Sequence, residues 1–305
     1  MSDDPFVSVI MPVYNGELYL ADAIESILNQ TYENIELIII NDGSTDDSLS
    51  IIKKYAAEDK RIVNVSRENK GLIKTLNECV QMSKGEYIAR MDSDDISLPY
   101  RLEMQIKLMV GSCLDVCGCH YSVINKYGKY IDTVYVPLDD NSLLLYLIQG
   151  VPFAHGAAVI RKGFLEDNEL SYGLGGVKYA EDKALWIRIY SLQGKFGNVN
   201  EVLFKYREFN QSLSKINSQE IRKDNDKMKS DFFKRHSEEV ASGVKALAND
   251  LEQLSNRELE YLADLTIRLF LGKKDIVYWR IFKKIPVRAK SIAFLKLLSG
   301  FIQSI

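Results

Sequence analysis

Gly85-Glu-Tyr-Ile-Ala-Arg-Met-Asp-Ser-Asp-Asp95 joins a short apolar run to three carboxylates. The apolar part, residues 87–91, has the length and composition of a buried β-strand. Similar runs precede it at residues 7–11, 35–40 and 62–65, and segments with the apolar spacing of amphipathic helices lie between them. A chain that alternates strands and helices in this way predicts an α/β fold, a mostly parallel sheet with helices on both faces.

The pattern changes after about residue 115. Further strands are predicted at residues 121–125, 130–136, 157–160 and 202–206, the first two joined by a hairpin turn. Helices are predicted at residues 142–148, 184–192, 218–235, 239–254 and 257–271. Because strand signals stop near residue 214, we expect an α/β domain over residues 1–212 and a helical C-terminal region over residues 213–305.

The composition is that of an ordinary globular chain. Its 305 residues include 39 basic and 42 acidic side chains, a net charge of −3, which argues against a nucleic-acid partner. No segment approaches 18 consecutive apolar residues, and the acidic start of the chain lacks an apolar stretch. Neither a transmembrane helix nor a secretory signal is therefore expected. Four cysteines are few for this length and favour the reducing cytoplasm.

Basic charge gathers at the C-terminal end. Residues 272–305 contain eight basic side chains and one acidic one, so this tail is +7 and the rest of the chain is −10. Large apolar side chains, among them Trp279, Ile281 and Phe282, alternate with the basic ones. One interpretation is that residues 273–305 lie in an anionic membrane surface. The other is a terminal helix that packs on the α/β domain with a solvated basic face, or a dimer contact.

Polar loops follow each of the first four predicted strands. They are Pro12-Val-Tyr-Asn15, Asn41-Asp-Gly-Ser44, Arg67-Glu-Asn-Lys70 and Asp92-Ser-Asp-Asp95. In an open parallel sheet, ligands bind beyond the carboxyl ends of the strands, and these ends meet at one edge. The sequence therefore predicts one binding site built from the four loops.

Asp92 and Asp94 are candidate ligands of a divalent cation. Carboxylates two residues apart in an extended segment point to the same side. Mg²⁺ and Mn²⁺ prefer oxygen ligands, and Mg²⁺ takes one or two carboxylates together with substrate phosphates. Because no glycine-rich phosphate loop follows any strand, a metal is the candidate for neutralising a bound phosphate. The alternative is an acidic turn that caps the helix predicted after Pro99.

Four motifs together resemble the family 2 glycosyltransferases, which have the GT-A fold. They are Ser8-Val-Ile-Met-Pro-Val-Tyr-Asn15, Ile40-Asn-Asp-Gly-Ser-Thr-Asp46, Asn69-Lys-Gly71 with Asn77, and the segment Gly85–Asp95. Their order and spacing agree with the family over about residues 6–215. The C-terminal helices lie outside the resemblance.

The resemblance implies a site for a nucleotide-sugar. The residues it assigns to that site are Pro12, Val13, Tyr14, Asp42, Asn69, Lys74, Asp92 and Ser93. Pro12 and Tyr14 match the nucleobase pocket, and Asp42 matches the carboxylate that binds the base or ribose. Asp92 then lies against the ribose and diphosphate, and Asp94 reaches Mn²⁺ or Mg²⁺. Taken one at a time, Tyr14 is equally a core aromatic and Asp42 an ordinary turn residue.

The segment Tyr179-Ala-Glu-Asp-Lys-Ala-Leu-Trp186 resembles the part of the family that carries the catalytic base. Inverting transfer needs a base that deprotonates the acceptor hydroxyl. The resemblance assigns this role to Asp182, with Glu181 in support. The alternative is a pair of acids that complement the N-terminus of a surface helix, a contribution of under about 1 kcal/mol.

Two further residues are candidate contacts for the acceptor or the diphosphate. His155 matches a histidine that the family often has before the next strand, although a structural histidine fits as well. Arg207 lies in a segment similar to the family's last motif, but Phe209 occupies the position of its histidine. Leu76 stands where many members have an arginine beside Asn77. These departures put part of the usual ligand contacts in doubt.

The sequence therefore predicts a metal-dependent, inverting glycosyltransferase. It would move a sugar from a nucleotide-diphosphate donor, with UDP favoured, to a glycan or polyprenyl-linked glycan, as in bacterial surface polysaccharide assembly. The expected location is the cytoplasm, at the inner face of the membrane if the tail binds there. One alternative is a sugar-nucleotide nucleotidyltransferase, which needs a basic, glycine-rich loop where Val13-Tyr-Asn-Gly16 stands. Another is a catalytically silent, membrane-docking scaffold, which has no need of all four acids Asp42, Asp92, Asp94 and Asp182.

Overall fold

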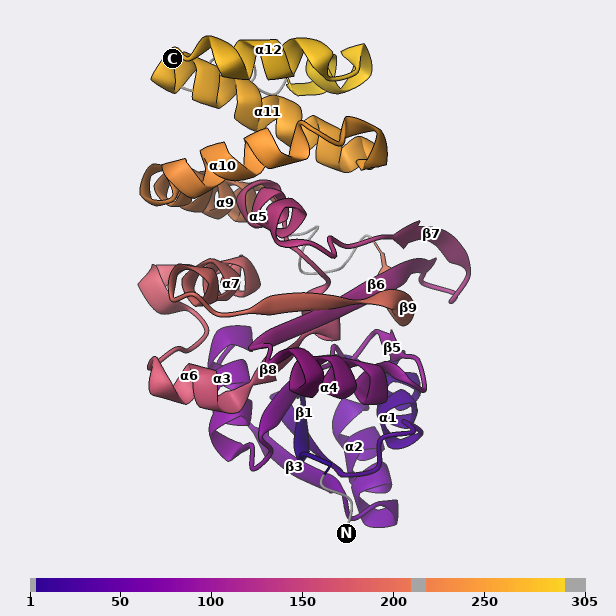
Figure 1. The fold of residues 1–305 in the computed structure, drawn as a ribbon. Helices are drawn as coiled ribbons and strands as arrows, with labels where there is room; N and C mark the ends of the chain where they lie inside the picture. Colours follow the sequence, from indigo (N-terminus) through magenta and orange to yellow (C-terminus); the bar gives the residue numbers. More distant parts are fainter. Residues whose placement is uncertain (1–3, 210–217, 294–305) are drawn as a thin grey trace. The chain divides into compact units, whose positions relative to one another are not determined.

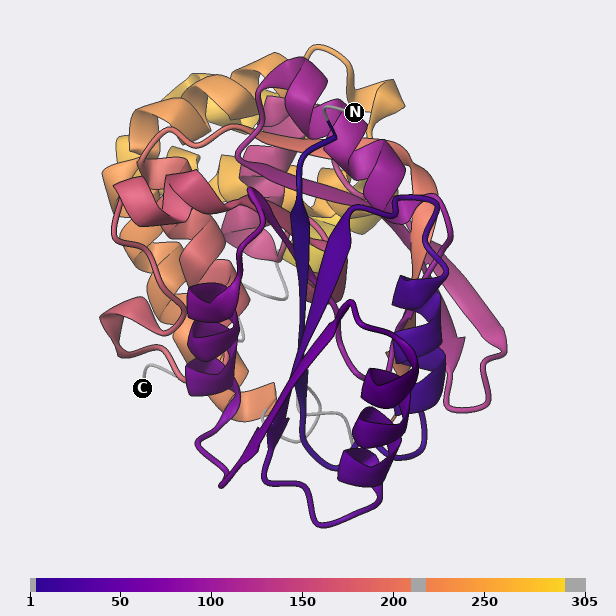
Figure 2. The same ribbon diagram turned by 90° about the horizontal axis from the view of Figure 1, so that it is seen from below.

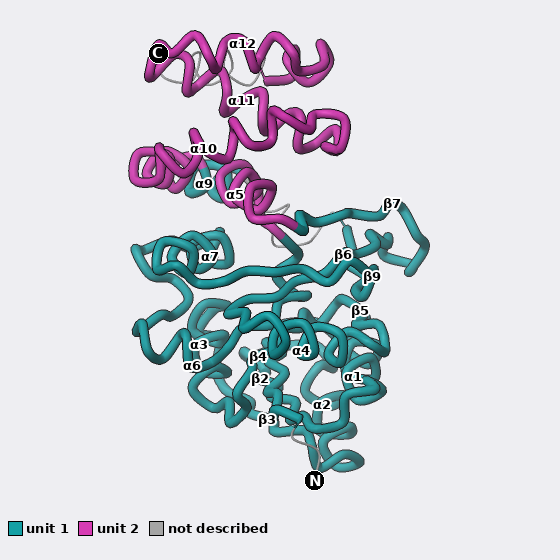
Figure 3. Tube along the Cα trace, viewed as in Figure 1, with its two compact units in different colours: residues 1–138, 153–225 teal, residues 139–152, 226–305 magenta. Residues whose placement is uncertain are grey.

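The computed structural model describes residues 4–209 and 218–293. The chain forms two compact units (Figure 3). Unit 1 comprises residues 1–138 and 153–225, and unit 2 comprises residues 139–152 and 226–305. The sequence predicted a single domain before residue 213. The structure divides the chain differently, because residues 139–152 belong with the C-terminal helices.

Unit 1 is built on one sheet whose first four strands are parallel. They are β1 (Val7–Val13), β2 (Ile35–Asp42), β3 (Ile62–Arg67) and β4 (Tyr87–Arg90). Their order in the sheet is β3-β2-β1-β4. Every residue of β1 and β2 is buried, as expected for strands covered on both faces. The predicted parallel sheet is confirmed.

Helices cover both faces of these strands. They are α1 (Leu20–Leu28), α2 (Ser48–Glu58) and α3 (Leu72–Met82), whereas α4 (Arg101–Ser112) packs mainly on later strands of the same sheet. α3 lies on one face of the parallel strands, and α1 and α2 lie on the other (Figure 1 and Figure 2). In α1 the buried residues are Leu20, Ala23, Ile24 and Ile27, which is the helical spacing that places one apolar stripe against the sheet.

The second half of the sheet mixes strand directions. Its strands are β5 (Ile96–Ser97), β6 (Val116–Asn125), β7 (Tyr130–Val134), β8 (Val159–Arg161) and β9 (Phe196–Glu208). The order continues as β4-β8-β6-β9-β5, and β7 forms the predicted hairpin with β6. β6 and β9 are parallel, whereas β8 is antiparallel to both of its neighbours. β9 starts earlier than predicted, because Asn198, Asn200 and Glu201 interrupt its apolar pattern.

The pairing of β5 with β9 fixes the loop that carries the acidic residues. Ile96 lies opposite Lys205, and Ser97 lies opposite Phe204, in antiparallel register. Residues 92–95, which directly precede β5, therefore lie beside the last residues of β9. The sheet in this way brings together two segments that are far apart in the sequence.

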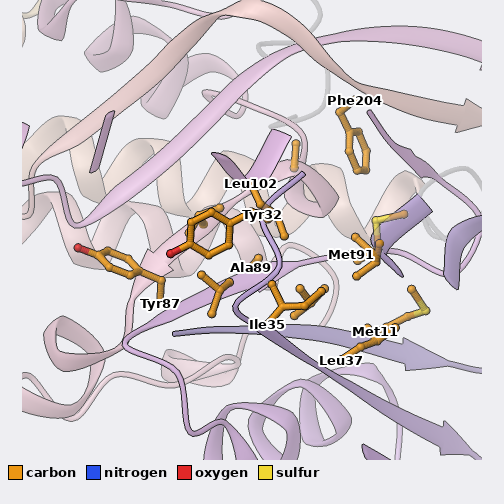
Figure 4. Packing of buried hydrophobic residues seen from close by; sticks show 14 of the residues in the cluster. Met11, Tyr32, Ile35, Leu37, Tyr87, Ala89, Met91, Leu102 and Phe204 are labelled. Carbon is orange, nitrogen blue, oxygen red and sulfur yellow. The ribbon is translucent and has the colours of Figure 1, made fainter. Parts of the chain in front are cut away.

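One apolar cluster joins the two halves of the sheet. Figure 4 shows Leu37 of β2, Ala89 of β4 and Phe204 of β9 in this cluster, with Leu102 of α4. All four side chains are fully buried. Burial of one large apolar side chain contributes about 1.5–3 kcal/mol, so such a cluster fixes β9 firmly against the parallel strands.

The remaining elements of unit 1 follow β7. They are the helices α6 (Lys162–Asp167) and α7 (Glu181–Ser191) and the single turns η1 (His155–Ala157) and η2 (Leu174–Gly176). The sequence predicted a helix at residues 184–192, and α7 begins three residues earlier. As a result, both acids of the predicted acceptor side lie in its first turn.

Unit 2 is helical. Its elements are α5 (Asp140–Gln149), α10 (Ser237–Leu247), η3 (Leu251–Gln253), α11 (Asn256–Lys273), α12 (Ile276–Lys284) and most of α9 (Ser218–Arg235). α5 contacts α10 and α11, and its residues 142–148 are all buried. On α11, Asp264 accepts from Lys229 at 3.0 Å and from Arg268 at 2.8 Å. The sequence predicted this helix correctly but assigned it to the α/β domain. The apolar pattern of a helix predicts its burial and does not show which unit it packs in.

α12 packs against α11 through its large apolar side chains. Tyr278, Ile281 and Phe282 are buried, as is Ile285 just after the helix. The packing partner of these residues is α11 of the same unit, whereas the sequence predicted the α/β domain as the partner, and their side chains are not available to a membrane. Residues 294–305 of the predicted tail lie outside the described part. Within residues 4–209 and 218–293, no helix has both the length and the hydropathy of a membrane span.

Candidate active site

The loops after β1 and β2 are tied together by hydrogen bonds. The Asn15 backbone N–H donates to Ser44 Oγ at 3.0 Å, and Asn15 Oδ1 accepts from the Thr45 N–H at 2.8 Å. The Gly16 N–H donates to Ser48 Oγ at 2.9 Å. Asn15 has a φ of 52°, in the left-handed region that asparagine adopts more readily than most residues. The two loops therefore form one rim at the edge of the sheet.

Tyr14 stands on this rim and is 55% exposed. Pro12 and Val13, which precede it, are buried in β1. The interpretation of Tyr14 as a core aromatic is therefore wrong, and its ring is accessible to a planar ligand. A Cβ at Gly16 would lie 3.1 Å from Ser93 Oγ, so the acidic loop after β4 reaches the same rim.

Asp42, at the end of β2, is held by the protein itself. Its carboxylate accepts hydrogen bonds from the backbone N–H groups of Lys70 at 2.7 Å and Gly71 at 2.9 Å, and it pairs with the Arg67 guanidinium. Only 5% of the side chain is exposed. Asp42 therefore fixes the loop between β3 and α3, and its contact with a nucleotide stays a prediction. Asn69 and Lys74, which were also predicted to contact the nucleotide-sugar, are exposed in this region.

Arg90 lies behind the acidic loop. It is the last residue of β4 and is 1% exposed. Its Nη2 donates to Asp92 Oδ1 at 2.6 Å, and its Nη1 donates to the Met91 backbone oxygen. A Cβ at Gly156 would lie 2.8 Å from Asp92 Oδ2, so η1 approaches the second carboxylate oxygen closely. Asp92 is thus held in one orientation from two sides.

Asp94 and Asp95 carry charge that the protein compensates only in part. Burial and the Asp92 carboxylate raise the pKa of Asp94 to about 7. Burial and both neighbouring carboxylates raise the pKa of Asp95 well above its usual value. Asp95 Oδ1 accepts from the Arg207 N–H at 2.7 Å, whereas its buried Oδ2 has no hydrogen-bond partner in the part that the structure describes. Such crowding of carboxylates favours a bound cation.

The residues present fit a divalent cation that binds together with a diphosphate. Asp92 and Asp94 offer oxygen ligands in one loop, and burial together with the Asp92 carboxylate raises the pKa of Asp94, so a cation there would be stabilised by the ionised form. Among the described residues, no three His, Cys, Asp or Glu side chains form a metal-binding group. A site completed by substrate phosphates needs only one or two carboxylates. We therefore retain Asp92 and Asp94 as the residues that would hold the metal.

Arg207 braces the acidic loop from β9. Its Nε donates to the Asp94 backbone oxygen at 2.7 Å, and its guanidinium lies 4.2 Å from the centre of the Tyr19 ring. Phe209, which stands where the resemblance predicts a histidine, packs on the same ring at 5.8 Å between centroids. Arg207 is 4% exposed, and its guanidinium is occupied by these contacts within the protein. A direct contact with the diphosphate stays a prediction.

The predicted base and its neighbour share an electrostatic environment with the acidic loop. Burial raises the pKa of Asp182, and the Asp92 carboxylate contributes in the same direction. Burial and Asp182 raise the pKa of Glu181 to about 7, with Asp92 again contributing. Glu181 is only 8% exposed, so it is not a solvated charge at a helix end. The structure thus brings together the donor-side and acceptor-side acids that the sequence predicted separately.

His155 lies between Tyr172 and Glu181. Its Nε2 is 3.2 Å from the Tyr172 hydroxyl, and its Nδ1 is 3.7 Å from a carboxylate oxygen of Glu181. Burial and the positive charge of Arg90 hold the pKa of His155 well below its usual value, so the imidazole is neutral. His155 therefore contacts the acceptor-side acids rather than the rim made by β1 and β2.

Three residues around the site were not predicted from the sequence: Arg90, Arg101 and Tyr172. Arg101 is fully buried, and its Nη1 donates to the Gly156 backbone oxygen at 3.1 Å. A signal was available for Arg90, because an arginine inside an apolar strand needs an acidic partner once it is buried. Tyr172 has no such signal, since its partners come from distant parts of the chain, and for Arg101 only the Ser97 hydroxyl is a local partner among the described residues.

Gly156→Ala is expected to destabilise the protein at the acidic loop. The new Cβ would lie 2.8 Å from Asp92 Oδ2, 2.9 Å from the Phe204 ring and 3.1 Å from Asp95 Oδ2. Overpacking of this kind costs about 1–3 kcal/mol. Gly111→Ala in α4 is the matched control: it meets open space and should stabilise the helix by up to about 1 kcal/mol. Urea unfolding measures both, and an unchanged midpoint for Gly156→Ala would refute this packing.

The stability of the protein is expected to fall as Glu181 ionises. Its pKa is about 7 in the folded protein against an ordinary value of 4.5, so the folded state binds the proton more tightly. The stabilisation is complete below about pH 4.5 and is lost as the pH rises through about 7. Glu181→Gln removes this titration. Between about pH 5 and pH 8, the free energy of unfolding of the variant should therefore rise by about 1–3 kcal/mol relative to that of wild type. Urea unfolding at each pH measures this difference. A difference that stays constant over this range would show that the pKa of Glu181 is not raised.

The fold defines the class of protein. Solved structures with the same architecture include S. aureus TarS residues 1–349 in complex with UDP-GlcNAc, with a TM-score of 0.58 and 19% identity over 91% of this chain and 90% of that chain. Another is the mannosyltransferase PcManGT from Pyrobaculum calidifontis in complex with GDP-Man and Mn²⁺, with a TM-score of 0.55 and 17% identity over 97% and 88%. The fold is that of the GT-A glycosyltransferases.

Sequence comparison shows the family. Residues 8–167 match the model of glycosyl transferase family 2. The O-antigen biosynthesis glycosyltransferase WbnJ of Escherichia coli is 36% identical over 212 residues, 68% of this chain and 82% of WbnJ. An uncharacterised glycosyltransferase of Haemophilus influenzae is 32% identical over 261 residues, 81% of this chain and 79% of that protein. The chain belongs to glycosyltransferase family 2, and it is an enzyme of that class.

Proposed function

We propose that this glycosyltransferase transfers a sugar, with inversion, from a nucleotide-diphosphate donor to a hydroxyl of a glycan or a lipid-linked glycan. The observation that carries the proposal is the common environment of two acid pairs. Asp92 and Asp94 form one pair, and Glu181 with Asp182 forms the other. The turn His155–Ala157 lies between them, because Gly156 approaches Asp92 and His155 Nδ1 is 3.7 Å from Glu181. The first pair suits a cation and a diphosphate, and the second suits removal of a proton from an acceptor.

On the donor side, the rim with Tyr14 would receive the nucleobase, and Asp92 with Asp94 would hold the metal. When bound, Mn²⁺ or Mg²⁺ stabilises, as a Lewis acid, the negative charge on the departing diphosphate. UDP is favoured as the carrier, and the UDP-GlcNAc in the TarS complex supports this choice. The Mn²⁺ in the PcManGT complex supports the metal.

On the acceptor side, Asp182 would act as the general base. The acceptor oxygen attacks the anomeric carbon, its proton passes to the Asp182 carboxylate, and the bond to the diphosphate breaks with its electron pair on the leaving oxygen. A base works best when its pKa lies near the operating pH, and burial raises the pKa of Asp182 in that direction. Glu181 and His155 would orient the acceptor around it.

The name of WbnJ supports an acceptor in surface polysaccharide assembly, because that relative is named for O-antigen biosynthesis. A nucleotidyltransferase finds no support, because the loop after β1 has neither the glycines nor the basic side chains that a triphosphate would need.

Thermal unfolding in the presence of nucleotides tests the proposal. UDP, GDP, dTDP and CDP are compared at saturating concentration, each with and without Mn²⁺. A ligand at 100 times its Kd stabilises the folded state by about 2.7 kcal/mol. We expect one nucleotide, UDP first, to raise Tm in a manner that requires Mn²⁺. Unchanged unfolding with all four nucleotides would contradict a donor site in this chain.

We further propose that the enzyme works at an anionic membrane surface, which the exposed face of α12 contacts. Ile276 and Val277 are 52% and 38% exposed, and Arg280, Lys283 and Lys284 share their face of the helix at spacings of three, four and seven residues. Exposed aliphatic side chains among basic ones suit anionic lipid. In this proposal they take the place of Tyr278 and Phe282, which are buried. A cytoplasmic location at the inner face of the membrane follows.

The pair of changes Arg280→Glu and Lys284→Glu is expected to abolish binding to anionic vesicles. Each basic residue near such a surface contributes about 1 kcal/mol, so two reversals should weaken binding by about a hundredfold or more. Sedimentation with phosphatidylcholine vesicles, with and without phosphatidylglycerol, measures the effect. Lys227→Glu with Lys234→Glu on α9 is the control of equal charge. Wild-type protein that stays in the supernatant with anionic vesicles would refute the membrane contact. A dimer detected by light scattering would favour the alternative, in which this face of α12 is a dimer contact.

A further inference from the structure

Asn77 of α3 makes a paired contact with a segment far along the chain. Its Nδ2 donates to the Tyr172 backbone oxygen at 3.0 Å, and its Oδ1 accepts from the Tyr172 backbone N–H at 2.9 Å. The side-chain amide thus satisfies both backbone groups of Tyr172, as a neighbouring strand would. Both polar ends of the Asn77 side chain point to Tyr172, so this residue holds a loop.

The residue after Tyr172 is pressed against the same helix. A Cβ at Gly173 would lie 2.7 Å from Ile73 Cγ2, and Gly173 has a φ of +79°. Gly175 and Gly176 also have left-handed backbones, with φ of +78° and +77°, and open space beside them. Glycine loses the most conformational freedom on ordering. A segment with three such glycines therefore depends on its anchors.

Tyr172 links this anchor to the acceptor side. Its ring is buried, and its hydroxyl lies 3.2 Å from His155 Nε2. His155 Nδ1 in turn lies 3.7 Å from the Glu181 carboxylate, and Asp182 is the next residue. The far end of the segment is held more loosely, by N–H groups of residues 178 and 179 that each lie 3.4 Å from Asp224 Oδ2. The path from α3 thus runs through hydrogen bonds as far as His155, and its last step is the 3.7 Å approach of the neutral His155 ring to the Glu181 carboxylate.

We propose that Asn77 is a positioning residue that anchors residues 172–180 and so holds Asp182 in its working place. Asn77 does not touch the reacting atoms. It fixes the Tyr172 backbone, which places the Tyr172 hydroxyl on His155 and His155 on Glu181. The role as base-positioning residue rests on the proposed function, because it assumes that Asp182 is the base. α3 begins next to the loop that Asp42 fixes, so one helix would set both the donor-side loop and the acceptor side.

Asn77→Ala tests the anchor by proteolysis and by kinetics. Lys178 is exposed within the anchored segment, so trypsin cleavage after it reports how often the segment opens. Loss of both hydrogen bonds should speed this cleavage by about tenfold or more. In an assay of nucleoside diphosphate release from the donor, kcat should fall by about tenfold and the KM for the donor should stay unchanged. Asn77→Asp, which keeps the acceptor for the Tyr172 N–H, should fall between Asn77→Ala and wild type in cleavage rate.

Gln81→Ala is the matched control, because Gln81 is exposed on the same helix. It should leave cleavage and turnover unchanged. Cleavage of Asn77→Ala at the wild-type rate would overturn the anchor, and faster cleavage with unchanged kcat would overturn the link to the base. Failure of the proposed function is seen separately, as wild-type protein that neither binds a nucleotide with Mn²⁺ nor releases one from any donor. The cleavage rates can still be measured in that case, because they do not depend on enzyme activity.

Discussion

Asp182→Asn is expected to lower the turnover number for glycosyl transfer by about 10²–10⁴-fold, the range that general bases supply. The amide has the same shape, and its oxygen can still accept from the Lys183 N–H, which donates to Asp182 Oδ1 at 2.6 Å. The variant should therefore fold, and it should bind the donor as wild type does, because only the proton acceptor is lost. The measurement is a kcat and KM determination with the donor found by the nucleotide panel.

Asp167→Asn is the control for this variant. Asp167 is an exposed acid at the end of α6, so the change removes the same charge from the same unit without touching the site. Its kinetics should equal those of wild type. If Asp182→Asn kept more than about a tenth of the activity, Asp182 would not be the base. A large loss in Glu181→Gln at the same time would move the role to Glu181.

Asp94→Ala is expected to separate stability from binding. Without ligand, the variant should be more stable than wild type above about pH 7, because Asp94 is buried beside Asp92 and its raised pKa shows that ionisation there is unfavourable. With the nucleotide and Mn²⁺, however, the stabilisation of about 2.7 kcal/mol at 100 times Kd should disappear. The two effects have opposite signs, so a misfolded variant cannot imitate them.

Thermal unfolding of wild type and Asp94→Ala, with and without nucleotide and Mn²⁺, measures both effects. Asp167→Asn serves again as the control and should keep the full shift. An Asp94→Ala variant that retains a Mn²⁺-dependent shift would show that the metal is held elsewhere. A shift that needs no metal in either protein would leave the donor site in place and remove the cation from it.

The first half of the fold was predictable from the sequence because its signals are local. The apolar runs of β1 and β2 are long and unbroken, since both faces of these strands are covered. Parallel strands also end at one edge, so the polar loops after them had to meet. The start of β9 was not predictable, because polar residues such as Asn198 and Asn200 interrupt its apolar pattern. α5 was predicted as a helix but assigned to the wrong unit, because an apolar pattern does not show which other helices it packs against.

The site was predictable in its residue types and less so in its contacts. Asp92, Asp94 and Asp182 stand out as acids at strand and helix ends, and the structure gives them one environment. Asp42 gave no sign that Arg67 and the backbone after β3 would occupy its carboxylate, because that pairing depends on the tertiary fold. Arg90 differs, because an arginine inside an apolar strand does signal an acidic partner, and in the fold its charge reaches acids on both sides of the site.

A crystal structure of the protein with UDP and Mn²⁺ tests the central claim most directly. The anomalous signal of manganese locates the metal independently of the nucleotide. We expect a manganese peak bound to the Asp94 carboxylate and the diphosphate, the uracil ring on the rim at Tyr14, and the Asp182 carboxylate facing the sugar side of the diphosphate. A manganese peak remote from Asp92 and Asp94, or UDP bound away from the strand ends, would contradict this claim.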